Sequence, residues 1–392
     1  MKFGFYSCMS GMPWGGSEVL WHRAARKLQR QGHQIAVNYK WWPTTPKTLL
    51  ELESEGAELW LRNRPMQPGI KKKIAEIKNM LGLHNGKHDP NEGWLEAANP
   101  DAVMITLGYH PDQIPVADKL LAKGIPYAIN VQCASNFFFI HGDKLDDYRR
   151  WYAGAEKVLF VSEENQHKVE TNIAMQLENA HIVANPFNVD YDADPSWPST
   201  DPIFKIACVG RIHFQSKGQD LIVDVLRRDH WRNRPVQVSF YGHDQGNKAQ
   251  LEELIRIHGL QDRLRFAGFV DSVEEIWEEN HALLLPSRYE GAPLVVIEAM
   301  LCNRMAISTD IGRNRELMDD GESGFIAEGA TIDLLDRVLE RAWEKREQWK
   351  EMGQLAGTHI RERYPRDPVH EFAEQIKSIC PAKDANAGSA TV

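Results

Sequence analysis

Cysteine is scarce in this sequence of 392 residues, which contains only five. They stand at Cys8, Cys133, Cys208, Cys302 and Cys380, far apart and without a C-x-x-C pair or the Cys/His spacing of a zinc site. Proteins held together by disulfides carry dense, paired cysteines. The sequence therefore predicts neither a disulfide framework nor a structural zinc, and it fits a reducing, cytoplasmic compartment.

Two further features are missing: an excess of positive charge and a long apolar run. Lys and Arg total 46 against 55 Asp and Glu, a formal net charge of −9, whereas a nucleic-acid-binding protein needs cations to neutralise phosphates. The chain turns polar soon after Tyr6, and no stretch approaches the roughly 20 apolar residues of a membrane span. We therefore expect no nucleic-acid partner, no secretion signal and no transmembrane helix.

What is present is a steady alternation of short apolar runs and longer helical patterns, typical of parallel sheets with crossover helices. We predict two doubly wound α/β domains. The first has strands near 3–6, 35–39, 59–61, 102–105, 127–131, 158–161 and 182–184, and the second has strands near 203–209, 236–241, 264–266, 282–285, 305–308 and 324–326. The boundaries are 1–187 for the first domain, 188–202 for a linker, 203–363 for the second domain, 364–380 for a helix that crosses back to the first domain, and 381–392 for a disordered tail.

The linker contains Asp192-Ala193-Asp194, which matches the D-x-D pattern of some metal-binding sites. A metal-binding D-x-D is expected directly after a buried strand, whereas this one lies among turn and breaker residues that include Pro195 and Pro198. We interpret it as linker chemistry and predict no metal site there.

Two cations follow the first strand of the second domain. The strand ends in Gly210-Arg211, and Lys217-Gly218 comes six residues later, before a helical run. Ligands of open α/β sheets bind at the carboxyl ends of the strands, and an Arg with a Lys suits a diphosphate. The alternative is a surface loop with two solvated cations.

A second motif, Ser287 to Met300, follows the strand that ends at Leu285. Pro293 suits the first position of a helix, so that Glu290 lies beside the free backbone donors of the helix start and Glu298 lies on its second turn. Both carboxylates could accept hydrogen bonds from sugar hydroxyls. The alternative is a solvated glutamate at each position.

Together these residues resemble family four of the retaining glycosyltransferases. Glu290 to Glu298 forms an E-x7-E motif, with Gly210-Arg211 and Lys217-Gly218 upstream, and the segments Thr309–Leu317 and Asp320–Phe325 are similar to the family's following loop and turn. The resemblance covers residues 206–327 and implies the GT-B fold, in which two Rossmann-like domains face a central cleft.

The resemblance also implies roles for individual residues. Arg211 and Lys217 would hold the diphosphate of a nucleotide-sugar donor, Glu290 would contact the donor sugar, and Glu298 would bind the ribose. Arg211, Lys217 and Glu290 are then the expected catalytic residues. Further donor contacts would come from the backbone of Ala292, Pro293, Leu294 and Val295, from Phe269-Val270 beside the nucleobase, and from Gly15 and Gly16 in the first domain.

The first domain departs from the family at one position. Many members carry a His after the strand at 127–131, where this chain has Gln132, and we expect Gln132 to contact the donor sugar or the acceptor or to pack as a structural residue. The resemblance implies transfer of a hexose-type sugar with retention of configuration, no cofactor and no metal. The base is open among uracil, guanine and adenine, and UDP is the nucleotide that we favour. A nucleotide-sugar 2-epimerase and a non-catalytic nucleotide-sugar-binding protein remain alternatives.

The acceptor stays open among a carbohydrate, a lipid-linked sugar and a small molecule. Lys71-Lys72-Lys73 lies in a segment in which Ile70, Ile74, Ile77 and Leu81 could line one helical face. Such a helix could touch the inner face of a membrane. The interpretation that we prefer is a helix packed on its domain with the lysines in water.

Overall fold

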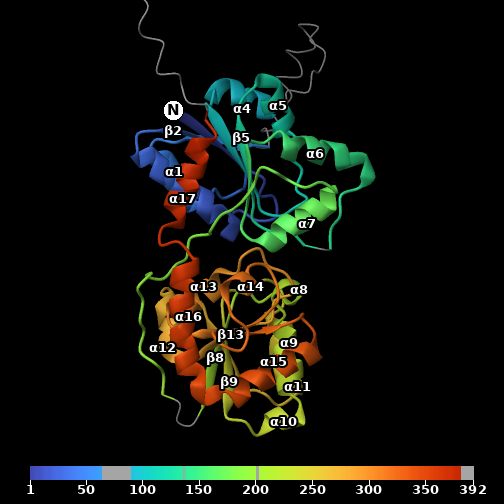
Figure 1. Ribbon diagram of the computed structural model, residues 1–392, viewed down its shortest axis with the longest axis vertical. Coiled ribbons are helices and arrows are strands. Elements are labelled where there is room, and N and C mark those ends of the chain that lie inside the picture. Colours follow the sequence, from blue (N-terminus) through green and yellow to red (C-terminus); the bar gives the residue numbers. More distant parts are fainter. Residues whose placement is uncertain (64–89, 136, 200–202, 381–392) are drawn as a thin grey trace, which may run out of the picture. The chain divides into compact units, whose positions relative to one another are not determined.

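The computed structural model describes residues 1–63, 90–135, 137–199 and 203–380 (Figure 1). The chain divides into two compact units. Unit 1 comprises Met1–Phe160, Lys168–Val183 and the described residues from Val369, and unit 2 comprises Val161–His167 and Ala184–Pro368. The segment with Lys71-Lys72-Lys73 and the tail 381–392 lie outside the described residues, so both remain predictions, as does the cleft between the two domains.

Unit 1 is built on a seven-stranded parallel sheet of order β3-β2-β1-β4-β5-β6-β7. The strands are β1 (Lys2–Ser7), β2 (Gln34–Lys40), β3 (Glu58–Arg62), β4 (Ala102–Leu107), β5 (Tyr127–Val131), β6 (Lys157–Phe160) and β7 (Ala180–Ile182). The connecting helices are α1 (Val19–Arg30), α2 (Lys47–Ser54), α4 (Pro90–Ala98), α5 (Val116–Lys123), α6 (Leu145–Ala153) and α7 (Glu163–Ile173), and the residues of α7 up to His167 are grouped with unit 2. This is the doubly wound topology that the sequence predicts.

The central strands of this sheet could be located from apolar runs in the sequence because they are fully buried. All six residues of β4 and all five of β5 are buried, because helices on both faces of a parallel sheet leave no side in water. The edge strand β7 was placed wrongly, at 182–184. Its own residues are half-buried or exposed, so the apolar residues Val183 and Ala184 that drew the prediction lie just beyond it.

Unit 2 has a six-stranded parallel sheet of order β10-β9-β8-β11-β12-β13. The strands are β8 (Phe204–Val209), β9 (Val236–Tyr241), β10 (Leu264–Gly268), β11 (Ala282–Leu285), β12 (Met305–Thr309) and β13 (Gly324–Ala327). The helices are α8 (Phe214–Lys217), α9 (Gln219–Leu226), α10 (Asp229–Arg232), α11 (Lys248–Ile257), α12 (Val273–Glu279), α13 (Leu294–Leu301), α14 (Asn314–Leu317), α15 (Ile332–Glu344) and α16 (Trp349–Arg363).

Two apolar cores sandwich this second sheet, and β8 shows how its sequence serves both. Ile206 and Cys208 join the core formed with α9, α11 and α15, whereas Ala207 joins the core formed with α12, α13 and α16. Successive side chains of a strand point to opposite faces, so one apolar run supplies both layers.

The linker lies along unit 2 and is tied to it by a buried arginine. Arg304 is 1% exposed and donates to the carbonyl oxygens of Trp277 at 2.6 Å, Asn280 at 3.0 Å and Ser196 at 2.7 Å. The two acidic residues of the D-x-D pattern also have structural partners, since Asp192 pairs with Arg366 and Asp194 accepts from Asn303.

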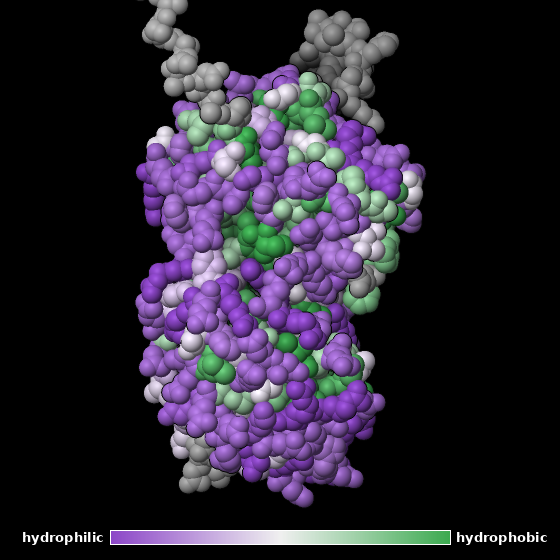
Figure 2. All heavy atoms as spheres, viewed as in Figure 1, coloured by the Kyte–Doolittle hydropathy of each residue, from purple (hydrophilic) through white to green (hydrophobic). Residues whose placement is uncertain are grey.

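The last helix, α17 (Pro368–Ser378), follows α16 and is grouped from Val369 onward with unit 1. Lys157 at the start of β6 donates to Gln375 at 2.7 Å and to Ser378 at 2.8 Å. On the face shown in Figure 2 the surface is mainly hydrophilic, with scattered apolar residues. No helix among the described residues has the length and hydropathy needed to cross a bilayer.

Candidate functional site

The carboxyl ends of β8 and β11 lie where the strand order of the second sheet reverses. The two strands pair only at Ile206 with Ala282 and at Ala207 with Leu283, so the segments that follow them are not joined by a ladder. A switch point of this kind is where open α/β sheets bind their ligands. Both motifs singled out in the sequence therefore begin at the same place in the sheet.

The segment after β8 is held by its own side chains. Gln219 donates from Nε2 to the Arg211 carbonyl oxygen at 2.8 Å, and its Oε1 accepts from the His213 backbone N–H at 3.3 Å. Burial, followed by the nearby positive charges of Arg211 and Lys217, lowers the pKa of His213 below its ordinary value. Arg211 is exposed and Lys217 is half-buried, and both belong to the segment that Gln219 holds.

The segment after β11 brings a carboxylate to one of these cations. Lys217 Nζ forms an ion pair with Glu290, and both side chains are about 15% exposed. Ser287 Oγ also donates to Glu290 Oε1, at 2.9 Å. Glu290 is therefore not a solvated surface residue, and two of the expected catalytic side chains lie in direct contact.

Helix α13 begins one residue later than the sequence predicts. Pro293 is the N-cap, with φ −71° and ψ 104°, and Leu294 is the first helical residue. The ring of Pro293 fixes φ but leaves ψ free to stay extended, which is why a proline rule alone misplaced the start. The backbone N–H groups of Leu294 and Val295 are those that an α-helix leaves without an intrahelical acceptor.

Glu298 lies on the second turn of α13, as expected, and is only 5% exposed. Its Oε1 accepts from the backbone N–H of Asn188 at 3.0 Å and from Asn188 Nδ2 at 2.9 Å. Glu298 thus fixes the start of the linker on unit 2, a contact that sequence reasoning missed. Its role toward a ribose stays a prediction.

The expected nucleobase region combines a buried and an exposed residue. Val270 packs against the core shared with α13, whereas Phe269 is 64% exposed and stacks on His243 with ring centroids 4.6 Å apart and an interplanar angle of 13°. His243 follows the end of β9 closely. Sequence reasoning missed His243, for which the only signal was its position after a strand.

The remaining predicted residues belong to unit 1. Gly15 caps a short 3-10 helix (Gly16–Glu18), and a Cβ there would meet the Met9 side chain at 3.0 Å, whereas a Cβ on Gly16 would meet nothing within 4 Å. Gln132 is buried at the end of β5, and its Nε2 donates to Asn130 Oδ1 at 2.7 Å. A side chain at position 15 would therefore require the Met9 side chain to shift, whereas position 16 has room for one.

Two carboxylates of unit 1 were missed by sequence reasoning. Glu18 is fully buried and accepts from Trp21 Nε1 at 2.9 Å, and burial raises its pKa above the ordinary value. Asp112, which follows β4, accepts from the Tyr109 backbone N–H at 3.3 Å, and burial raises its pKa to about 6.

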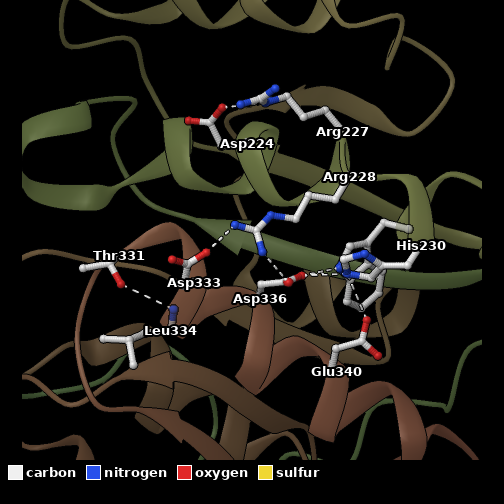
Figure 3. Close-up of polar contacts among 10 residues, drawn as sticks. Asp224, Arg227, Arg228, His230, Thr331, Asp333, Leu334, Asp336 and Glu340 are labelled. Carbon is white, nitrogen blue, oxygen red and sulfur yellow. Dashed lines mark hydrogen bonds and ion pairs between the residues drawn. The ribbon is translucent and has the colours of Figure 1, made fainter.

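A separate cluster of side chains in unit 2 has the composition of a metal site. His230 Nε2 lies 3.0 Å from Asp336 Oδ1 and 3.1 Å from Glu340 Oε1 (Figure 3). Arg228 already pairs with Asp336 at 2.6 Å and Arg234 with Glu340 at 2.7 Å, and Trp231 Nε1 donates to Asp336 at 2.7 Å. The carboxylates thus have cationic partners, so we interpret this cluster as an ion-pair network joining α10 to α15.

The chain resembles known glycosyltransferases in sequence and in fold. A family model described as "Glycosyl transferases group 1" matches residues 203–343. The 2-deoxystreptamine N-acetyl-D-glucosaminyltransferase of Streptomyces fradiae is 21% identical to the chain, over 96% of this chain and 94% of its own length. The structure of HepE from Anabaena in complex with UDP aligns with a TM-score of 0.69 at 17% identity, over 96% of this chain and 100% of HepE.

The chain has the GT-B fold, and its residues 203–343 match the glycosyltransferase group 1 family model. The residues that the family model matches include Arg211, Lys217 and the E-x7-E motif, and the structural likeness, at its low identity, supports the fold of the whole chain. Other relatives match a smaller part. The lipopolysaccharide core biosynthesis mannosyltransferase LpsB of Rhizobium meliloti is 31% identical over 32% of this chain and 38% of its own length.

Proposed function

We propose that this glycosyltransferase moves a hexose-type sugar from a nucleoside-diphosphate sugar to an acceptor hydroxyl with retention of anomeric configuration. The observation that carries the proposal is the meeting of Lys217 with Glu290 at the switch point of the second sheet, next to the N-terminus of α13. A cation, a carboxylate and unpaired backbone donors in one place suit a diphosphate joined to a sugar.

Each group has a role in this reaction. Arg211, Lys217 and the first N–H groups of α13 stabilise the negative charge that grows on the departing diphosphate, which is the electrostatic form of catalysis. Glu290 accepts a hydrogen bond from a hydroxyl of the donor sugar. The protein groups supply the positive charge themselves, so the proposed reaction requires no metal and no cofactor.

The favoured donor is a UDP-sugar. HepE, which shares the fold, was solved with UDP and with UDP-glucose. For the acceptor, the relative that matches nearly the whole chain is named for 2-deoxystreptamine, a small molecule. We therefore place a small-molecule or carbohydrate acceptor first and a lipid-linked acceptor second.

The first test is thermal stabilisation by UDP, GDP, ADP and CDP in the presence of EDTA. A ligand that binds the native state raises its apparent stability by mass action. We expect a shift with UDP that a Lys217→Ala variant loses. If none of the four nucleotides gives a shift, with EDTA or after magnesium is added, the proposed donor site is wrong.

The second test separates transfer from its alternatives. The purified protein is incubated with UDP-glucose or UDP-N-acetylglucosamine, with and without a panel of acceptors, and UDP release is measured. We expect release that depends on an acceptor. Conversion of the donor without an acceptor would favour an epimerase, and tight binding without any turnover would favour a binding protein.

A further inference from the structure

Arg288 joins the two segments that build the donor site. It lies between β11 and Glu290, and its guanidinium donates to Asp220 Oδ1 at 2.9 Å and to Asp220 Oδ2 at 2.7 Å. The same guanidinium also donates to the carbonyl oxygen of Phe214. In addition, the backbone N–H of Arg288 donates to the Ser216 carbonyl oxygen at 2.8 Å. All of these acceptors lie in the segment 214–220, which carries Lys217.

The contacts of Arg288 hold the backbone that carries Lys217 in place. A lysine has a flexible stem with many rotamers, so the position of its ammonium group depends on how firmly the backbone beneath it is held. Arg288 bonds the carbonyl oxygens at 214 and 216 and the side chain at 220, on both sides of Lys217. Two residues further along its own segment, Glu290 receives the Lys217 ammonium group.

Arg288 is not itself arranged to bind the donor. Both of its Nη atoms are bonded to Asp220, in the paired geometry that satisfies a guanidinium most fully. About a quarter of each side chain is exposed, 27% for Arg288 and 24% for Asp220, so the pair is partly shielded from water. Releasing Arg288 toward a phosphate would leave the Asp220 carboxylate without this partner.

We infer that Arg288 and Asp220 form a clamp that positions Lys217 and Glu290 for the diphosphate and sugar of the donor. The inference rests on the proposed function and extends it to two residues that the sequence analysis gave no role. Arg288 and Asp220 are positioning residues, because they act through Lys217 without touching the substrate. Their removal therefore weakens donor binding only while Lys217 is present.

The test is a double-mutant cycle between Arg288→Ala and Lys217→Ala, read out as affinity for whichever of UDP, GDP, ADP and CDP binds the unaltered protein most tightly. Residues that act as a unit give non-additive effects. We expect Arg288→Ala to weaken binding about tenfold when Lys217 is present and less than about twofold when it is replaced. Arg227→Ala is the matched control, because Arg227 follows the last residue of α9 and pairs with Asp224 of the same helix.

Two milder variants keep the test valid if Arg288→Ala folds poorly. Asp220→Asn keeps the size of the side chain and removes its charge, and Arg288→Lys keeps the charge and removes the planar fork. We expect both to weaken nucleotide binding by about threefold to fivefold, less than Arg288→Ala. The unfolding midpoint of every variant is measured without ligand, so that affinities are compared only between folded proteins.

The outcomes separate the clamp from the donor site. If Lys217→Ala binds as tightly as the unaltered protein, or if no nucleotide binds, the proposed donor site is wrong and the clamp falls with it. If Lys217→Ala weakens nucleotide binding but Arg288→Ala changes the affinity equally with and without Lys217, or does not change it, the donor site stands and the clamp is refuted.

Discussion

Replacing Gly218 by alanine tests how closely the two segments of the donor site approach each other. Gly218 ends α8 with φ 66°, and a Cβ on it would lie 2.2 Å from the Pro286 carbonyl oxygen, immediately before the segment that carries Arg288 and Glu290. Gly259 provides a matched control. Its φ is 67°, and a Cβ on it would meet nothing within 4 Å.

The two substitutions share one cost and differ in another. A left-handed conformation costs an alanine about 1–2 kcal/mol, and both variants lose this amount. In Gly218→Ala the Cβ and the Pro286 oxygen must also separate by more than an ångström to reach ordinary contact at 3.4–4 Å, and forced overpacking costs about 1–3 kcal/mol more. For a domain of this size that extra cost corresponds to roughly 2–12 °C in Tm.

The assay is thermal unfolding of both variants and of the unaltered protein, followed by titration with UDP. We expect Gly259→Ala to lose a few degrees and to bind UDP normally, and Gly218→Ala to lose clearly more and to bind UDP more weakly, because the Pro286 segment must move. Equal Tm values and equal UDP affinities for the two variants would refute the close approach.

Three further predictions concern stability. Burial raises the pKa of Asp112 to about 6, so the stability that its protonated form contributes is present below pH 4 and is lost as the pH rises through 6. Asp112→Asn should therefore gain about 1–2 kcal/mol of unfolding free energy at pH 7.5, after discounting for partial exposure. Urea unfolding that shows no gain would contradict this. Asp336→Asn should lose about 2–3 kcal/mol of unfolding free energy. Asp333→Asn, whose more exposed carboxylate pairs with the same Arg228, should lose less than about 1 kcal/mol. Equal losses of the two variants in urea unfolding would contradict the larger role of Asp336 in the network of Figure 3. Arg304→Met should lose about 3–5 kcal/mol, because it leaves several buried carbonyl oxygens unpaired, and limited proteolysis should then cut the linker near residue 196 sooner; an unchanged cleavage rate would refute the tie.

Much of the fold could be predicted because local patterns encode it. Strands buried on both faces are mostly apolar, so β4, β5 and β11 appear in the sequence as nearly continuous apolar runs. The meeting of the two motifs of the proposed donor site was also predictable, since each directly follows such a strand and the topology of a parallel sheet brings strand ends together. The edge strand β7 was misplaced because its own side chains are not buried.

The partners of the site residues could not be predicted in the same way. Arg288 and Asp220 are separated by 68 positions and Asn188 and Glu298 by 110, and no periodic pattern connects residues so far apart. Each pair also joins a strand-following segment or helix to a loop or to the linker, where spacing rules do not apply. Burial gives only a general expectation, that a polar group in the interior has a partner, without identifying it.

The contact between Lys217 and Glu290 determines how the proposed donor must bind. The ammonium group that would receive the diphosphate is already neutralised by the Glu290 carboxylate in a partly shielded site. A diphosphate that approaches Lys217 meets the like charge of Glu290, so it binds more tightly when the carboxylate turns to a new hydrogen-bond donor. A hydroxyl of the attached sugar is such a donor, whereas free phosphate offers none in that position. The ion pair therefore favours a complete nucleotide-sugar over free phosphate, because only the complete donor satisfies the cation and the carboxylate together.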